Sequence, residues 1–351
     1  MKTNSSTTTI GIDLGDRKHS ICVLAVDGKI LAETTLANTR EAMSRFSKKY
    51  PGALVVMEVG MQSPWISRFF TDLGHRVLVA NPRKVRAIYQ NDRKCDRKDA
   101  AMLAKLARAD ETLLAPIEHG TEQAQLDLLQ VKLRDNLVRQ RVDVISAVRF
   151  TLKSLGIRLG SPNTNCFARH ARRELAEGDA GILALIEPSL MVIETMTAQI
   201  KKLDGAIAEL AAESYPETEV LTQIAGVGPI TSLTFILTIG DPERFRRPRD
   251  IGAYLGLVPK RDQSGDTDKQ MRISKAGDTY LRKLLVGAAQ YVLGPFGPDT
   301  TLKRHGQKLA ERGGPRAKKK AVVAIARKLA VLMLALWREE QIYKPLRHRA
   351  A

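Results

Sequence analysis

The chain has 351 residues and a formal charge of +18, from 56 Lys and Arg against 38 Asp and Glu. This length suffices for two or three domains with separate cores, and the charge favours a polyanionic partner over an acidic one. Three scattered cysteines, Cys22, Cys95 and Cys166, lack the spacing of a zinc site or a disulfide framework and fit a reducing cytoplasm. We expect no signal peptide and no membrane span, because the N-terminus lacks an apolar core and the longest apolar run, Leu329–Trp337, is too short.

Residues 1–118 predict an α/β domain. Strands are expected at Thr8–Leu14, Ser20–Ala25, Lys29–Thr35, up to Glu58 and at Arg76–Ala80, with helices after Asn38 and around Ser63–Leu73. Asp27-Gly28 indicates a hairpin between the second and third strands. Three hairpin-linked strands followed by strand–helix alternation predict a ribonuclease-H-like fold, with a mixed sheet and helices on its faces.

Four acidic residues of this domain carry the strongest functional indication. Asp13 lies in the first apolar strand, Glu58 ends a later one, and Asp96 and Asp99 are spaced i, i+3, so on a helix they face the same way. Clustered carboxylates repel one another and are costly without a cation. Two Mg²⁺ ions about 4 Å apart would relieve that cost and would activate a nucleophile on a phosphodiester.

Residues 119–215 predict long helices. Apolar residues recur at helical spacing in two stretches: Leu126, Leu129, Leu133 and Leu137, then Ile193, Met196, Ile200, Leu203, Ile207 and Leu210. The second stretch alternates steps of three and four, which is typical of a coiled coil. Pro188 suits the first turn of its helix, and Gly160–Asn165 reads as a loop. We expect an antiparallel helical hairpin that pairs with another protomer; the alternative is an intramolecular arm.

Residues 216–351 predict a mainly α-helical domain with phosphate-binding loops. Gly226 and Gly228 resemble the turn of a helix–hairpin–helix, whose backbone N–H groups hold a phosphate; the alternative is a tight turn between core helices. The segments 256–265 and 272–278 favour an ordered loop meeting a phosphate backbone. Its candidate contact residues are Lys260, Arg261, Arg272 and Lys275. A last helix carries Ile325, Leu329, Leu332 and Leu336 after the basic run 316–320.

Taken together these stretches resemble the insertion-sequence 110 family, the DEDD transposases, which are bridge-RNA-guided DNA recombinases. The resemblance spans nearly the whole chain, although Phe167–Gly181 shows no pattern that can be aligned. The N-terminal motifs are Gly11-Ile-Asp13, Met57-Glu58, Ala80-Asn-Pro82 and Asp96-Arg-Lys-Asp-Ala100. The C-terminal motifs are Ile224–Gly228, the Phe245 region, Gly252–Pro259, Gln263-Ser-Gly265 and Arg272–Gly277. Two independent motif sets thus occur in the family's order.

The resemblance implies an architecture of α/β plus α. It comprises a RuvC-like (ribonuclease-H-like) domain at 1–118, a helical coiled-coil dimerisation segment at 119–215 and a C-terminal transposase domain at 216–351. Asp13, Glu58, Asp96 and Asp99 would form the metal-binding tetrad. Ser264 falls at the family's catalytic serine, which would attack a DNA phosphate and form a transient 5′-phosphoserine link.

The implied partners are a non-coding bridge RNA, donor and target double-stranded DNA, and further copies of the chain in a dimer or tetramer. The tetrad of one protomer would meet the serine domain of another. The implied location is the cytoplasm of a prokaryote, at the nucleoid, without a membrane.

The residues themselves also bear on how Ser264 could be activated, apart from the family resemblance. A serine hydroxyl is a weak nucleophile at neutral pH, and the sequence offers no evident Ser-His-Asp set around Ser264, so activation through the carboxylate tetrad is the more economical route. No Gly-x-x-x-x-Gly-Lys-Ser/Thr loop is present, which fits strand rejoining without ATP. Two alternatives remain: a RuvC-like junction resolvase that hydrolyses DNA with the tetrad alone, and a non-enzymatic nucleic-acid scaffold.

Overall fold

The computed structural model describes residues 8–85, 95–160, 162–176, 180–264, 267–314, 316–339 and 342–346. The chain divides into two compact units, residues 1–122 and 123–351. The helical arm and the C-terminal helices fall within one unit, so a boundary between them near residue 215 stays a prediction.

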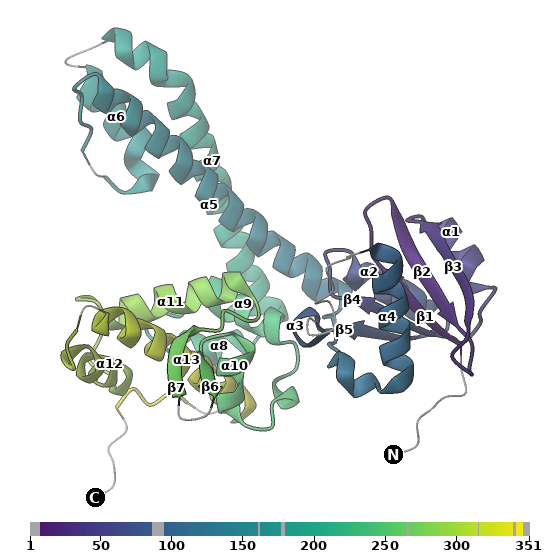
Figure 1. The fold of residues 1–351 in the computed structure, drawn as a ribbon. Helices are drawn as coiled ribbons and strands as arrows, with labels where there is room; N and C mark the ends of the chain where they lie inside the picture. The colour runs from purple at the N-terminus through teal and green to yellow at the C-terminus, as the bar shows by residue number, and fades with distance from the viewer. Residues whose placement is uncertain are drawn as a thin grey trace, which may run out of the picture. The chain divides into compact units, whose positions relative to one another are not determined.

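The first unit is built on a five-stranded mixed sheet (Figure 1). Its strands are β1 (Thr9–Asp13), β2 (Lys18–Leu24), β3 (Ile30–Ala37), β4 (Leu54–Glu58) and β5 (Arg76–Ala80). Their order in the sheet is β3-β2-β1-β4-β5. The three hairpin-linked strands pair antiparallel, whereas β1, β4 and β5 run parallel. The predicted mixed sheet is confirmed, and its strand order is compatible with a ribonuclease-H-like domain.

Helices cover both faces of this sheet because the side chains of each strand alternate between them. The helices are α1 (Arg40–Ser47), α2 (Ser63–Asp72), α3 (Pro82–Val85) and α4 (Asp96–Ala109), followed by the 3₁₀ turn η2 (Glu111–Leu114). Ile10 and Ile12 pack with α1 and α2 through Met43 and Phe70. The opposite face of β1, β2 and β4 packs against α4.

The second unit begins with a helical arm. It comprises α5 (Glu122–Ser154), the 3₁₀ turn η3 (Thr164–Cys166), α6 (Phe167–Ala176) and α7 (Ala180–Ser214). The predicted α7 stripe is confirmed: Ile193, Ile200 and Ile207 are buried, and Met196, Leu203 and Leu210 are half-buried.

The predicted helix is present as α5, but its leucine stripe is not the face that the unit buries. Leu126, Leu129 and Leu133 are about half exposed. The buried face instead carries Val131, Ile145, Val148 and Leu152, together with the polar residues Asp127 and Arg141. Both polar side chains are bonded there: the Tyr215 hydroxyl donates to Asp127 at 2.5 Å, and Arg141 Nη1 donates to the Thr197 hydroxyl at 3.0 Å. Because two buried positions are polar, an apolar pattern could not identify this face.

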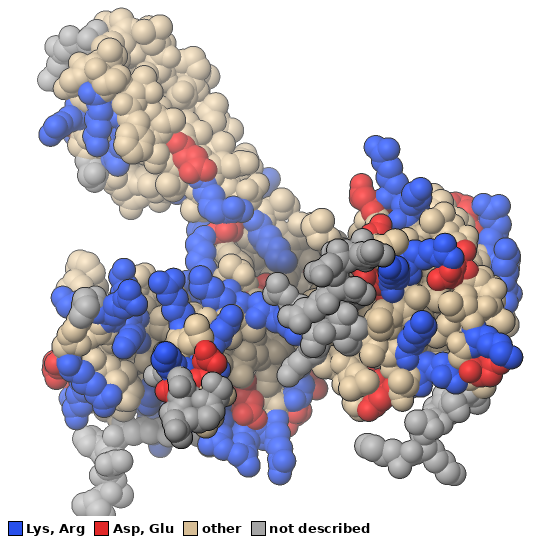
Figure 2. Space-filling view, viewed as in Figure 1, with Lys and Arg blue, Asp and Glu red and all other residues tan. Residues whose placement is uncertain are grey.

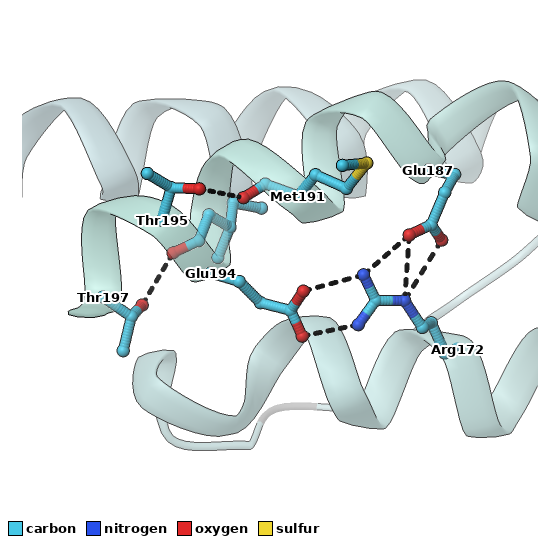
Figure 3. A network of polar contacts seen from close by, with 7 residues as sticks. Arg172, Glu187, Met191, Glu194, Thr195 and Thr197 are labelled. Carbon is cyan, nitrogen blue, oxygen red and sulfur yellow. Dashed lines mark hydrogen bonds and ion pairs between the residues drawn. The ribbon is translucent and has the colours of Figure 1, made fainter.

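The sequence predicts Pro188 in the first turn of its helix. This prediction is wrong, because α7 begins at Ala180 and Pro188 lies inside it. The preceding turns are held by Ile182, Leu183 and Ile186, which pack against the buried face of α6. Arg172 of α6 lies between two carboxylates of α7 (Figure 3): its Nη2 is 2.7 Å from Glu187 Oε1 and 2.8 Å from Glu194 Oε2. These ion pairs hold the pKa of both glutamates below its usual range.

By length and composition alone, α7 could cross a membrane. Its apolar stripe has another partner, since Ile193 packs with α5 and α6, and Ile207 packs with α5 and α9 (Pro229–Ile239).

The C-terminal part of the second unit is a helical body with one β-hairpin. Its elements are α8 (Thr218–Thr222), α9, η4 (Pro242–Arg244), η5 (Pro248–Asp250), α10 (Ile251–Tyr254), β6 (Pro259–Ser264), β7 (Thr267–Ile273), α11 (Thr279–Leu293), α12 (Thr301–Glu311) and α13 (Ala317–Glu339). The core lies between α9, α11 and α13, where Phe235, Leu285 and Leu329 are buried. The ordered loop expected from segments 256–265 and 272–278 is corrected here: Pro259–Ser264 and Thr267–Ile273 form a two-stranded antiparallel hairpin.

Candidate active site

Asp13 and Glu58 end two neighbouring parallel strands. The register pairs Ile12 of β1 with Met57 of β4, so the next residue on each strand is one of the acids. Carboxyl ends of adjacent parallel strands meet at the same edge of a sheet. Both acids are half-buried there. The sheet therefore brings these two predicted site residues together.

Helix α4 runs against β1 in the opposite direction. Near its C-terminal end, Arg108 Nη2 donates to the Val26 carbonyl of the β2–β3 turn at 3.0 Å. This turn lies beside the start of β1, because Thr9 of β1 pairs with Leu24 at the end of β2. The first turn of the helix therefore lies toward the Asp13 end of β1. Asp96 and Asp99 both fall in that turn. The first turn of α4, which carries Asp96 and Asp99, is thus directed toward the edge where Asp13 and Glu58 end their strands.

Helix geometry supplies a second reason for acids at these two positions. Carboxylates in the first turn of a helix are favoured by its unpaired N–H groups and by its macrodipole. Asp96 is exposed, whereas Asp99 is half-buried.

Carboxylate oxygens are the ligands that Mg²⁺ prefers, so the donor set fits this ion chemically. Within the described ranges, however, no three His, Cys, Asp or Glu side chains converge closely enough to hold a metal ion. The backbone directs two strand ends and the first turn of α4 toward one end of the sheet, but the described acidic side chains form no such group. Their role as metal ligands stays a prediction.

Ser63 and His119 form a clamp beside this edge that sequence reasoning missed. The Ser63 hydroxyl accepts from the Gly60 N–H at 3.0 Å and donates to the Gly60 carbonyl at 2.8 Å. The His119 Nε2 lies 2.9 Å from the same hydroxyl, so its N–H donates to the remaining lone pair. The clamp fixes the chain two residues after Glu58. No short motif joins residues 56 positions apart, so local patterns do not reveal this contact.

Burial lowers the pKa of His119, and the nearby Arg68 cation lowers it further. The imidazole is therefore neutral at physiological pH. A neutral ring with its proton on Nε2 satisfies the Ser63 hydroxyl without adding a positive charge to the acidic edge.

Ser264 is the last residue of β6, where its backbone pairs with Thr267 of β7. The expected turn residue Gly265 lies outside the described residues. The neighbouring Gln263 is exposed. Ser264 thus stands at the far end of the hairpin, in the second unit, whereas the four acids belong to the first.

The predicted nucleic-acid contacts lie on two features of the second unit. Gly226 and Gly228 join α8 to α9, and Gly226 needs its positive φ of 87° for the turn. Lys260, Arg261, Arg272 and Lys275 are exposed on or just after the hairpin strands. Arg261 Nε donates to Asp268 at 2.7 Å across the hairpin, so part of its charge is already paired.

Basic side chains dominate the visible face of the C-terminal helical body (Figure 2). A surface of this kind attracts a phosphate backbone irrespective of sequence. The exposed hairpin and the α8–α9 turn belong to the same unit. Charge and geometry therefore agree on a polyanionic ligand for this unit.

Two family models match the chain. A model for DEDD transposases of the IS110 type, described as a transposase, matches residues 10–157. A second, described as the transposase IS116/IS110/IS902 family, matches residues 218–305. Together they cover more than half of the chain and include the four acids and Ser264.

Several relatives match over nearly their whole length. A probable family 20 transposase of Pseudomonas aeruginosa is 29% identical over 96% of this chain and 98% of its own. The transposase for insertion sequence element IS1111A of Coxiella burnetii is 26% identical over 95% of this chain and 91% of its own. A pilin gene-inverting protein of Moraxella bovis is 23% identical over 96% of this chain and 97% of its own. The chain belongs to the IS110 family of DEDD transposases.

Proposed function

We propose that this transposase is a DNA recombinase guided by a non-coding bridge RNA, which exchanges strands through a covalent link to Ser264. A DNA-cutting and strand-transfer activity follows from membership of the family. The proposal adds the nucleophile, the guide and the assembly. A transposase is expected to be soluble and cytoplasmic, and its substrate is DNA.

The observation that carries the proposal is the pairing of two features in one chain. One unit carries Asp13 and Glu58 at the ends of neighbouring parallel strands and Asp96 and Asp99 in the first turn of α4. The other presents Ser264 at the end of an exposed hairpin. A nuclease that only hydrolyses DNA requires the acids alone. The relative named as a gene-inverting protein also favours recombination, because inversion must rejoin the strands it cuts.

The covalent step conserves the phosphodiester bond. The Ser264 Oγ attacks phosphorus, the Oγ–P bond forms as the P–O3′ bond breaks, and the 5′-phosphate stays on the serine. The proton lost by the hydroxyl is balanced by the proton that the released 3′ oxygen gains. Attack by a 3′ hydroxyl of another strand reverses these changes and restores the serine, so no ATP is required.

The family implies a divalent metal. We assign two Mg²⁺ ions to Asp13, Glu58, Asp96 and Asp99, whose oxygens suit this ion. Such ions lower the pKa of a coordinated hydroxyl and screen charge on the phosphate. The protein's own contribution is positional: parallel strands set Asp13 beside Glu58, and the Ser63–His119 clamp fixes the chain that follows Glu58.

The bridge RNA and the DNA would bind the basic surfaces of both units. The charge of +18 supports a polyanionic partner. Exposed Lys260, Arg272 and Lys275, at the base of the hairpin that ends in Ser264, offer contacts to phosphates. If base pairing with the RNA selects donor and target DNA, the protein needs to read only shape and backbone.

Assembly of two or more copies would complete the site. We propose that the tetrad of one protomer serves the hairpin of another in a dimer or tetramer. The α5–α7 arm supports this because it exposes Leu126, Leu129 and Leu133 along one helix. Functionally the chain then has three parts, a RuvC-like domain at 1–118, an assembly arm at 119–215 and a serine domain at 216–351.

A denaturation-resistant protein–DNA adduct tests the proposal. The full chain is incubated with its flanking transcript, donor DNA and Mg²⁺, then denatured and separated by size. We expect DNA of the 5′-phosphate side to stay attached to the protein. Free cut ends without an adduct would support a hydrolytic junction resolvase, and intact DNA would support a scaffold. An adduct formed equally well with an unrelated RNA of the same length would remove the guide from the proposal.

A further inference from the structure

The β6–β7 hairpin is held mainly at its base. Pro259, Lys260, Arg261, Asp262 and Gln263 of β6 are all exposed. On β7, Asp268, Lys269, Met271 and Arg272 are exposed as well. A two-stranded hairpin is marginally stable alone in water. Its direction must therefore be set where the chain enters and leaves it.

The entering and leaving segments interlock at that base. A Cβ placed on Gly256 would lie 2.1 Å from the Ala276 amide nitrogen, and one on Gly277 would lie 2.1 Å from the Tyr254 carbonyl oxygen. Both glycines have positive φ, of 67° and 70°. The Lys275 N–H donates to the Gly256 carbonyl at 3.1 Å. Only glycine allows the two backbones to approach this closely.

Arg282 of α11 bonds to both segments at once. Its Nη1 donates to the Leu255 carbonyl at 2.9 Å, on the entering side, and to the Ala276 carbonyl at 2.6 Å, on the leaving side. Its Nη2 donates to the Thr279 hydroxyl at 3.2 Å. The residue is only 8% exposed. A buried guanidinium that bridges two backbone segments acts as a staple between them.

The helix that carries Arg282 is itself firmly placed. The Asp278 side chain caps its first turn by accepting from the Leu281 N–H at 2.7 Å. Leu281 and Leu285 are fully buried in the core of the helical body. The guanidinium therefore transmits the position of a rigid helix to the base of an exposed hairpin.

We propose that Arg282 is a positioning residue for strand transfer, which aims the hairpin that carries Ser264. This rests on the proposed role of that serine. The six residues of β6 extend about 20 Å from base to tip, so a rotation of about 10° at the base moves the tip by about 3.5 Å. A misplacement of about 1 Å at a reacting group can cost about 100-fold in rate.

The test compares Arg282→Met with Lys303→Met in the full chain. Lys303 is a matched control because it too is a cation bonded to two carbonyls in this unit: its Nζ donates to Gly294 at 3.0 Å and to Gly297 at 2.6 Å. Hydrogen exchange of the amides at 260–264 and 267–273 reports on the hairpin. The rate of adduct formation at saturating DNA and the Kd for DNA are measured in parallel.

We expect Arg282→Met to speed exchange in the hairpin and to slow adduct formation about tenfold or more, with the Kd for DNA little changed. Lys303→Met should lower the unfolding midpoint without either effect. Arg282→Lys keeps a cation that can reach one carbonyl and should recover part of the rate. This variant also serves if the methionine variant does not fold.

Equal slowing in Arg282→Met and Lys303→Met would overturn the proposal, since the effect would then follow stability alone. Unchanged hairpin exchange in both Arg282 variants would overturn it as well. Failure of the proposed function reads differently. If the wild-type protein forms no adduct while hairpin exchange still depends on Arg282, then Arg282 still positions the hairpin, and the proposed role of Ser264 is refuted.

Discussion

Gly11 of β1 lies directly against Ala100 of α4. A Cβ placed on Gly11 would come within 2.0 Å of the Ala100 carbonyl oxygen and 2.8 Å of the Ala104 amide nitrogen. This contact sets the separation of the strand that ends in Asp13 from the helix that begins at Asp96. The absence of one side chain therefore controls how near the acids of α4 come to the acid of β1.

Gly11→Ala should push α4 away from the sheet. We expect a loss of about 1–3 kcal/mol in the free energy of unfolding, as for other overpacked sites, and a larger fractional loss of strand transfer than stability alone explains. Gly205→Ala is the control, because nothing lies within 4 Å of the Cβ it adds to α7, and it should be neutral or stabilising by about 1 kcal/mol. Wild-type activity in Gly11→Ala would show that the strand–helix spacing does not matter to the site.

Removing single carboxylates should stop chemistry and spare binding. Asp13→Asn, Glu58→Gln, Asp96→Asn and Asp99→Asn each weaken a cation site, so we expect each to abolish recombination while RNA affinity stays within about twofold of the wild-type value. Stability without metal should be equal or slightly higher, because the acids repel one another.

Asp16→Asn is the matched control at the same edge. Asp16 is exposed, and its Oδ1 accepts from the Gln62 Nε2 at 3.4 Å, a bond that an asparagine oxygen can keep. Recombination and RNA affinity are measured for all five variants. Wild-type recombination in two of the four tetrad variants, or its loss in Asp16→Asn, would refute the assignment.

Acid should destabilise the first unit through His75. Its Nδ1–H donates to the Ala53 carbonyl at 3.2 Å, and its Nε2 accepts from the Ser47 hydroxyl at 2.6 Å. Burial lowers its pKa below the ordinary 6.5, so the folded ring is neutral. The unfolded chain then binds more protons below about pH 6.5, and stability falls as the pH falls, by up to about 1.4 kcal/mol per pH unit.

His75→Gln should flatten this dependence. Glutamine does not titrate and can both donate and accept. We therefore expect the difference in unfolding free energy between about pH 7.5 and about pH 5.5 to be smaller in the variant than in the wild type. Denaturant titrations at the two pH values provide the comparison. Identical differences would mean that His75 binds protons equally in both states.

The exposed leucines of α5 should mediate self-association. Leu129 and Leu133 are 49% and 50% exposed, so replacing both with Glu should lower the oligomer mass in sedimentation and leave the unfolding midpoint nearly unchanged. Ile200→Ala is the opposite control: this residue is 3% exposed, and its loss should cost about 2–5 kcal/mol. An unchanged mass in the Leu129→Glu, Leu133→Glu protein would make the arm purely intramolecular.

Local patterns in the sequence predicted much of the first unit. The strand Arg76–Ala80 has the predicted bounds, and β4 ends at Glu58 as predicted. Alternating or continuous apolar runs bounded by turn residues are local signals, and the parallel pairing of β1 with β4 follows from their order. The neighbouring positions of Asp13 and Glu58 could therefore be anticipated.

The remaining features depend on contacts between distant residues. The buried face of α5 includes Asp127 and Arg141, which are bonded to Tyr215 and Thr197, and no apolar periodicity reveals such a face. The sequence predicts a loop in place of the hairpin β6–β7, because the exposed strands are rich in Lys, Arg and Asp and show little apolar alternation. The Arg282 staple and the Ser63–His119 clamp likewise join residues that are far apart in the sequence.

The central claim is that Ser264 is the nucleophile, and the adduct assay with Ser264→Ala and Ser274→Ala tests it most directly. Ser274 is the matched control in the same block; it follows β7, and its hydroxyl accepts from the Ala276 N–H at 3.4 Å. If a loop serine only bonds backbone, its loss should cost about 1 kcal/mol and leave the chemistry intact.

We predict that Ser264→Ala eliminates the covalent adduct and all strand exchange while binding of RNA and DNA persists, and that Ser274→Ala forms the adduct like the wild type. An adduct that survives in Ser264→Ala, or that disappears only in Ser274→Ala, would contradict this account.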